Sequence, residues 1–191
     1  MTVLEAGSVY KVDEDSKIKV AASIYFSNFI KGSKLDDGNF QTGWADNSLD
    51  STGALLYDYN PITMSAEYVH KHLLGMIPGK IMLEFAQNPG APVQNKAYVM
   101  GVQIGDDKLK EAGKWQAQLI YTRLERDAWL DMLPDSGAYM GATNFKGAYL
   151  TARYVVATNT VAACRISPYL EKISGATNPQ QMVQLDFMVN F

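Results

Sequence analysis

The chain has 191 residues, a formal net charge of −3 and one cysteine. This length allows one domain or a small barrel, the weak negative charge offers no basic field for nucleic acid, and Cys164 alone excludes an internal disulfide. No apolar run reaches the roughly 18 residues that a membrane-spanning helix requires. Alternation with a period of two recurs along the chain and helical periodicity is nearly absent, which predicts an all-β protein.

In chain order, we expect nine strands, or about nine to ten. The first two cover about residues 2–12 and 17–29, and residues 30–52 form a long loop rich in Gly, Asp, Asn and Ser. The third, about 53–72, changes the parity of its apolar side chains at Asn60-Pro61. Because proline cannot donate to the ladder, we expect a bulge there. The other strands are expected at about 79–88, 95–105, 114–126, 145–157, 160–171 and 180–191.

The final strand has the clearest pattern. Its apolar residues occupy every second position, so one face is apolar and the other is largely polar. Lipid can cover such an apolar face, while barrel closure satisfies the backbone, so the pattern predicts an antiparallel transmembrane β-barrel. The tail resembles the C-terminal signal that the barrel-assembly machinery of the bacterial outer membrane reads. The proposed assembly signal comprises Val183, Leu185, Phe187, Val189 and Phe191.

The lengths of the links alternate along the chain. Short links at 13–16, 73–78 and 158–160 and a medium one at 106–113 alternate with longer loops at 30–52 and 127–144 and medium ones at 89–94 and 172–179. Outer-membrane barrels have short periplasmic turns, longer extracellular loops and an even number of strands. If the last strand ends in the periplasm, the first would start outside the cell. We therefore expect residues 1–191 to be a single outer-membrane β-barrel domain that lacks N-terminal strands of a larger barrel. A miscount by one strand is the alternative.

Several strand-and-turn segments carry a family resemblance. They are residues 97–105, 113–121, 123–125 with Asp127-Ala128, Asp135-Ser136, 147–150 with Arg153-Tyr154, and the tail. On these segments, the sequence from about Ile62 to Phe191 resembles the putative porin family of Gram-negative outer membranes. The resemblance implies a longer barrel that passes small polar solutes by diffusion and contains no catalytic residues or cofactors. The partners that follow are outer-membrane lipid and lipopolysaccharide, the barrel-assembly machinery, and further barrel-forming segments or a homo-oligomer such as a trimer.

If the apolar parity faces lipid, the other parity lines the lumen. A three-residue link at 158–160 would place Arg153 opposite Arg165, with Asp186 on the next strand. These three side chains form either a charged patch that orients solutes or an ion cluster that braces the wall. The predicted lumen-lining residues are Glu67, Gln103, Gln116, Gln118, Thr151, Arg153, Arg165, Gln184 and Asp186.

Catalytic and metal signals are weak. His70 and His72 form a His-x-His pair that can chelate zinc or copper, but the chain has no further histidine, so solvated interface residues are expected. Gly105-Asp106-Asp107 resembles a fragment of a calcium loop whose other ligand positions are not filled. No nucleotide-binding motif or Ser–His arrangement accompanies them. We expect no enzyme activity, metal or cofactor.

Two other interpretations of the sequence stay open. A small closed barrel of eight to ten strands, packed inside, would serve as a structural anchor or a sheath for a partner. A soluble β-sandwich or lipocalin-like carrier would instead pack its apolar faces inward.

Overall fold

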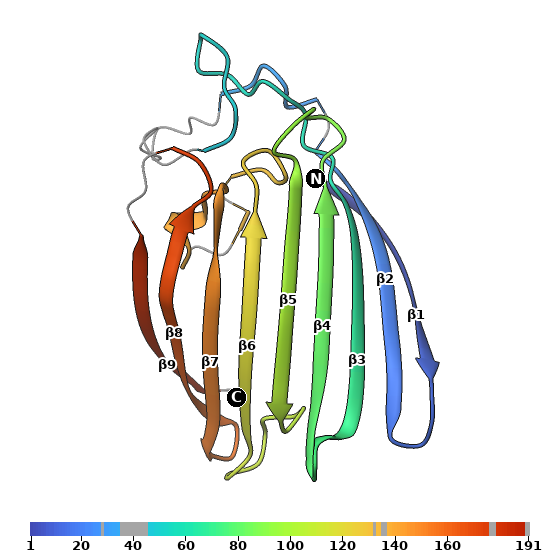
Figure 1. Cartoon of the computed structure of the whole chain (residues 1–191). Coiled ribbons are helices and arrows are strands. Elements are labelled where there is room, and N and C mark those ends of the chain that lie inside the picture. The colour runs from blue at the N-terminus through green and yellow to red at the C-terminus, as the bar shows by residue number, and fades with distance from the viewer. Residues whose placement is uncertain (28, 35–45, 132, 135–136, 176–178, 190–191) are drawn as a thin grey trace.

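The computed structural model describes residues 1–27, 29–34, 46–131, 133–134, 137–175 and 179–189. Within these ranges the chain forms one antiparallel sheet in which every strand pairs with its neighbours in sequence (Figure 1). The strands are β1 (Thr2–Lys11), β2 (Ser16–Phe26), β3 (Ile62–Leu74), β4 (Ile77–Gln87), β5 (Lys96–Gly105), β6 (Trp115–Leu124), β7 (Phe145–Ala157), β8 (Thr160–Lys172) and β9 (Gln180–Val189). One short 3-10 helix, η1, covers Tyr139–Gly141.

The predicted all-β antiparallel fold and the nine strands are confirmed, but the bulge in the third strand is wrong. β3 begins at Ile62, directly after Pro61, and residues 53–61 form turns and irregular backbone. Tyr59 is fully buried in this segment, and the carbonyl of Pro61 accepts a hydrogen bond from the N–H of Tyr25. The parity changes at Asn60-Pro61 because a loop ends there and a strand begins.

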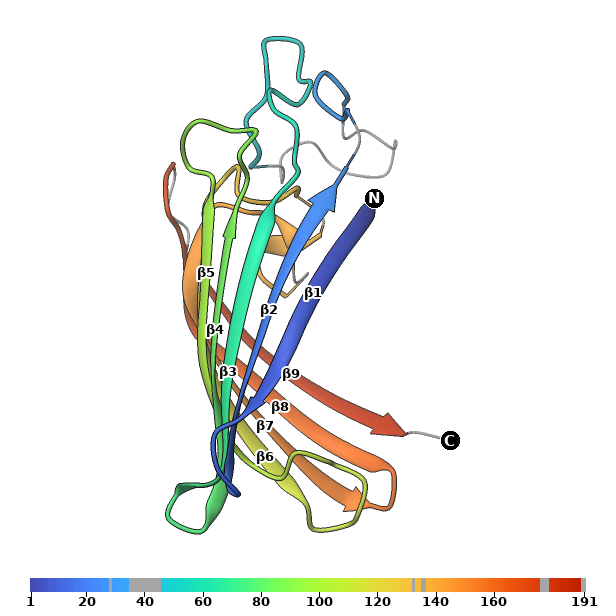
Figure 2. The same cartoon turned by 90° about the vertical axis from the view of Figure 1, so that its right-hand side faces the viewer.

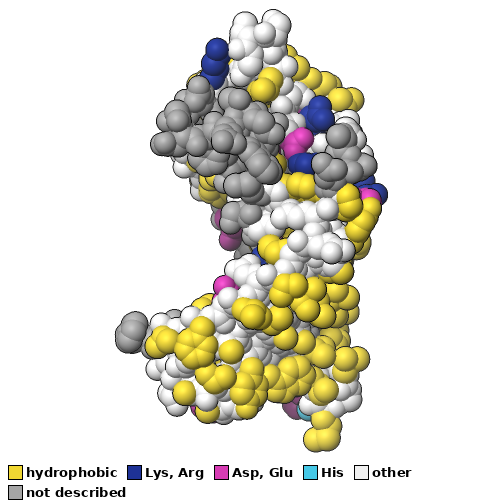
Figure 3. All heavy atoms as spheres, turned by 90° about the vertical axis from the view of Figure 1, so that its left-hand side faces the viewer, with side chains coloured by type: hydrophobic (Ala, Val, Ile, Leu, Met, Phe, Trp, Pro, Cys, Tyr) yellow, Lys and Arg dark blue, Asp and Glu magenta, His cyan; other side chains and the backbone are white. Residues whose placement is uncertain are grey.

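The sheet is strongly curved, and its two faces differ in chemistry (Figure 2). On the outer face, apolar side chains such as Leu83 and Leu119 remain about half exposed. On the inner face, the polar side chains of Gln103, Gln116 and Thr151 are buried. Hydrophobic side chains gather over the lower part of the molecule on the side of β9 (Figure 3). The apolar faces therefore point outward, and the inward packing expected of a soluble carrier is wrong.

The links between strands differ between the two ends of the sheet. The β1–β2, β3–β4, β5–β6 and β7–β8 links lie at one end, here called the turn end. The other four links, which include the two longest, β2–β3 and β6–β7, lie at the other end, the loop end (Figure 1). β1 and β9 are the edges of the sheet, and both run from the loop end toward the turn end. The strands of the described chain thus form an open sheet rather than a closed small barrel.

No helix in the described part of the chain is long and apolar enough to cross a membrane.

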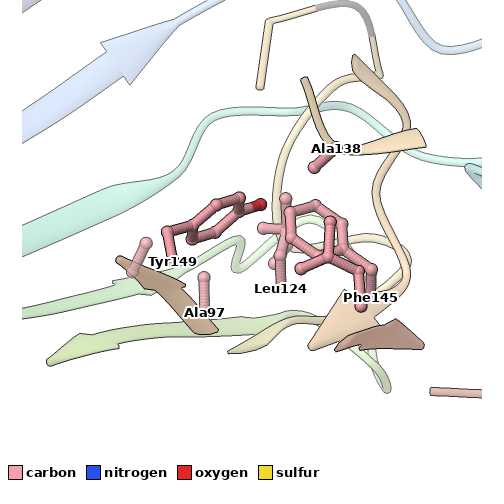
Figure 4. Packing of buried hydrophobic residues seen from close by; sticks show 8 residues of the cluster. Ala97, Leu124, Ala138, Phe145 and Tyr149 are labelled. Atoms are coloured by element: carbon pink, nitrogen blue, oxygen red, sulfur yellow. The ribbon is translucent and has the colours of Figure 1, made fainter. Parts of the chain in front are cut away.

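The described residues of the segment 125–144, here called the inner loop, fold onto the inner face of the sheet. Ala128 and Ala138 of this loop are buried against residues that the inner face supplies. Trp129 and Tyr139 pack around the same cluster. The inner-face members are Ala86, Ala97, Leu124, Phe145, Tyr149 and Leu170, several of which are labelled in Figure 4. This cluster covers the inner face near the loop end and leaves the part nearer the turn end uncovered.

Two buried carboxylates attach the inner loop to the segment before β3. Asp131 accepts the backbone N–H groups of Asp46 at 2.7 Å, Asn47 at 2.6 Å and Thr143 at 2.6 Å. Burial raises the pKa of Asp131 above its ordinary value, although these N–H groups act to lower it. Asp131 is therefore a buried carboxyl group that serves as the hydrogen-bond acceptor of three backbone N–H groups.

Asp127 makes the second attachment. It accepts the hydroxyl hydrogen of Tyr59 at 2.7 Å and both the N–H and the hydroxyl of Ser48, at 2.8 and 2.6 Å. Burial, followed by the hydrogen bond to Asp127, raises the pKa of Tyr59, so this phenol stays protonated and continues to donate. The inner loop is thus fixed by hydrogen bonds as well as by apolar packing.

Replacing Asp131 with alanine should loosen the inner loop, because three backbone N–H groups lose their acceptor at a cost of about 1–3 kcal/mol for each group left buried. We expect a lower unfolding temperature and faster proteolysis within residues 125–144 of the folded protein. Asp107→Ala, at an exposed position in the β5–β6 link, is the matched control. Unchanged proteolysis of the Asp131 variant would show that apolar packing alone fixes the loop.

Candidate functional site

The candidate site is the polar surface on the inner face of the sheet. Strand pairing aligns inward side chains of neighbouring strands into rows, and one row continues across six strands from β4 to β9. With strands about 4.8 Å apart, this row is about 24 Å long. Its members, here called the polar row, are Lys80, Gln103, Gln118, Thr151, Arg165 and Gln184. A continuous row of hydrogen-bonding side chains can coat a wall that faces water.

A second inner row lies one step nearer the turn end. It contains Gln116, Arg153, Ala163 and Asp186 in consecutive strands. Glu67 lies one step nearer the loop end than the polar row, opposite Met82. All nine residues that the sequence assigned to a lumen therefore share the inner face, and the lining of an open lumen by them stays a prediction.

The register predicted between Arg153 and Arg165 is wrong. Arg153 pairs with Ala163, and Arg165 pairs with Thr151. The β7–β8 turn has two residues rather than three, with Asn159 in the left-handed region at a φ of 60°, and the pairing shifts again between Val155 and Ala157. Each of these two features shifts the pairing by one residue, so the partner of Arg153 moves by two positions, from Arg165 to Ala163. The arginines are therefore diagonal neighbours on the inner face rather than a directly opposed pair.

Each arginine of the candidate site has a local partner. Nη1 of Arg153 donates to Oε1 of Gln116 at 3.0 Å, and the guanidinium of Arg165 lies 4.3 Å from the ring centroid of Tyr149. Asp186 accepts Nε2 of Gln184 at 2.9 Å. A planar guanidinium on an aromatic face keeps its charge while its orientation is fixed. The two arginines thus form a positively charged region on β7 and β8.

A second charged group lies across the inner face on β2, β3 and β4. Glu67 binds Nζ of Lys19 at 2.8 Å and Nζ of Lys80 at 3.2 Å. The sequence analysis named Glu67 but missed both lysines. The alternation of Lys19 with Ile18 and Val20 was a usable signal, because it already placed Lys19 on the face opposite the apolar side chains.

The histidine pair lies where β3 pairs irregularly with β4 near the turn end. The N–H of His72 donates to Nδ1 of His70 at 2.8 Å, and the two ring centroids are 6.3 Å apart. Across the described ranges, no three His, Cys, Asp or Glu side chains are grouped so that they could hold a metal ion. The geometry therefore adds no third ligand to the pair.

The proposed assembly signal lies on the outer face of β9. The side chains of Val183, Leu185 and Phe187 are each more than two-thirds exposed, and Val189 is about half exposed. Phe191 lies outside the described residues. Recognition of this face by assembly machinery stays a prediction.

Comparison with known families gives one match. The profile of a family described as putative porin matches residues 48–191, which is more than half of the chain. Comparisons with curated proteins and with solved structures gave no match. The match begins before β3 and includes the inner loop, the polar row and β9.

Paired cysteines test the corrected register. In a Cys164→Ser background, Thr151→Cys with Arg165→Cys should cross-link on mild oxidation, because directly opposed Cβ atoms in a sheet are about 4.5–5.5 Å apart. Arg153→Cys with Arg165→Cys should stay reduced, because diagonal neighbours are about 7–8 Å apart. Mass spectrometry of the protein oxidised in its folded state detects the disulfide bond. Preferential cross-linking of the second pair would restore the register expected from the sequence.

Proposed function

Because this chain belongs to the putative porin family, we propose that it forms part of the wall of a porin-like channel in the bacterial outer membrane. Small polar solutes diffuse passively through its water-filled lumen. The observation that carries this proposal is the arrangement of the two faces, with apolar side chains exposed outside and hydrogen-bonding side chains aligned inside. Such a sheet suits lipid on one side and water on the other.

The backbone supports the same proposal. Each interior strand satisfies its N–H and C=O groups through both neighbours, which is the condition for crossing a lipid bilayer. Among the described strands, β1 and β9 each pair on one side only, so a closed barrel needs further strands. We propose that closure supplies these strands, with lipid and lipopolysaccharide around the apolar surface. Assembly by the barrel-assembly machinery and association into trimers are part of the same proposal.

The directions of the edges restrict how closure occurs. β1 and β9 run the same way, so an antiparallel barrel needs an odd number of strands between them. A second copy in the same membrane orientation would offer its β1 to β9 in parallel. We therefore favour strands from a further segment of the protein. Barrels of about 16–18 strands leave an aqueous channel, whereas about eight strands fill their own interior.

Arg153 and Arg165 should set the charge preference of the channel, because they are diagonal neighbours on the inner face, and rings of charged side chains in a pore select ions of opposite charge. The proposal predicts discrete current steps in planar bilayers that contain the folded protein. Replacing both arginines with serine should lower the preference for anions, read as a shift of the reversal potential in a salt gradient.

The control is Arg123→Ser, which makes the same kind of replacement once, on the outer face of β6. It should leave the reversal potential unchanged. An identical reversal potential for the inner double variant would make the two arginines structural only. Folded barrels that insert but pass no current would favour an anchor or sheath over a channel.

A further inference from the structure

A cavity of about 450 Å³ lies between the inner loop and the inner face near the loop end. Trp129, Leu133 and Pro134 of the inner loop form one wall. The sheet forms the other wall, with contributions from β1 to β6 that include Glu5, Tyr25 and Glu84. This volume is typical of sites for small organic molecules. The cavity is part of the same inner face as the polar row.

Two aromatic rings in the wall of the cavity contact each other. Tyr25 of β2 and Trp129 of the inner loop make an edge-to-face contact with ring centroids 4.7 Å apart and planes at 69°. Both side chains are only partly buried, so aromatic surface is available to a ligand. The faces of tryptophan and tyrosine attract cations, and tryptophan does so most strongly.

The carboxylates of the cavity lack cationic partners. In the described part of the chain, Glu84 is exposed and makes no hydrogen bond or ion pair, and Glu5 only accepts the hydroxyl hydrogen of Ser23 at 2.9 Å. Glu67, one row nearer the turn end, differs because Lys19 and Lys80 neutralise it. Glu84 and Glu5 therefore give the cavity a negative charge that nothing described offsets directly.

From this geometry we propose that the cavity binds small organic cations, namely ammonium compounds with an apolar or aromatic body. The ammonium group would lie near Glu84 and the body against Trp129 and Tyr25. A hard divalent ion does not suit the site, because it needs six or more oxygen ligands and the walls include Leu133 and Pro134. The inference deepens the proposed function: the same channel would hold this cavity on β1–β6 and the arginines on β7 and β8.

Benzyltrimethylammonium is a suitable probe, since it is permanently charged and carries one ring. It should block the current through the folded protein in a concentration-dependent way. Glu84→Gln and Trp129→Leu should each raise the half-blocking concentration about three- to tenfold, as expected for one partly exposed charge or one cation–π contact. Benzoate, an anion of similar size, should not block at the same concentrations.

Two matched controls remove the same chemistry elsewhere. Glu111→Gln changes an exposed carboxylate in the β5–β6 link at the turn end, and Trp115→Leu removes an aromatic ring from the outer face of β6, where Trp115 pairs with Tyr154. The probe should block the current through both control variants at the same concentration as in the unmodified protein. Equal block of all four variants, or equal block by benzoate, would overturn the cation site.

Calorimetric binding of the same probe to the folded protein in detergent separates this inference from the proposed function. Absence of current with intact, Glu84-dependent binding would reject the channel and keep the site. Normal current without Glu84-dependent binding would keep the channel and reject the site.

Discussion

The antiparallel ladder is the constraint on which the rest of this structure depends. Because side chains alternate along a strand, a continuous ladder from β1 to β9 assigns every residue to one of two faces. On the outer face, the apolar side chains include Leu83, Leu119 and Leu185. On the inner face, the strand pairing aligns Gln103, Gln118 and Arg165 in one row. A slip by one residue in a strand pair would turn inner polar side chains such as Gln103 or Gln118 toward the apolar surface, so the two faces and the register support each other.

The inner loop depends on a different interaction. Asp127 and Asp131 are both buried, and each accepts several hydrogen bonds from segments far away in sequence. This network holds Trp129 over the inner face, where it forms one side of the 450 Å³ cavity. Because both carboxylates are buried, they attach the loop without adding an exposed charge to the inner face. Glu84 and Arg153 of the sheet are not buried, and they lie nearer the loop end and nearer the turn end of the inner face, respectively.

The sequence predicted the features that alternation controls. The turn residues at 13–16 and the apolar positions from Val183 to Val189 placed the strands to within a few residues, except at β3. Parity alone was sufficient to bring nine polar residues to one face. The partners of those residues were not predictable with the same accuracy. A two-residue turn and an irregularity at Val155 set which residue opposes Arg153, and neither changes the apolar pattern.

The inner loop was beyond this kind of prediction for a physical reason. Residues 127–144 have no periodic pattern, so nothing local indicated that Trp129 packs against the sheet or contacts Tyr25. The same is true of Tyr59, whose burial depends on Asp127, 68 residues later in the chain. Contacts of this type follow from where the ladder brings loops together, and they become visible only once the sheet is formed.

The most direct test of a water-filled lumen compares two adjacent positions on β6. In a Cys164→Ser background, a charged, water-soluble thiol reagent is added to open channels that carry Gln118→Cys or Leu119→Cys. The account predicts that modification at position 118 reduces the current, because this side chain belongs to the polar row, and that position 119 in the lipid-facing surface has no effect. Current loss at position 119 with none at position 118 would contradict the assignment of the faces and the channel built on it.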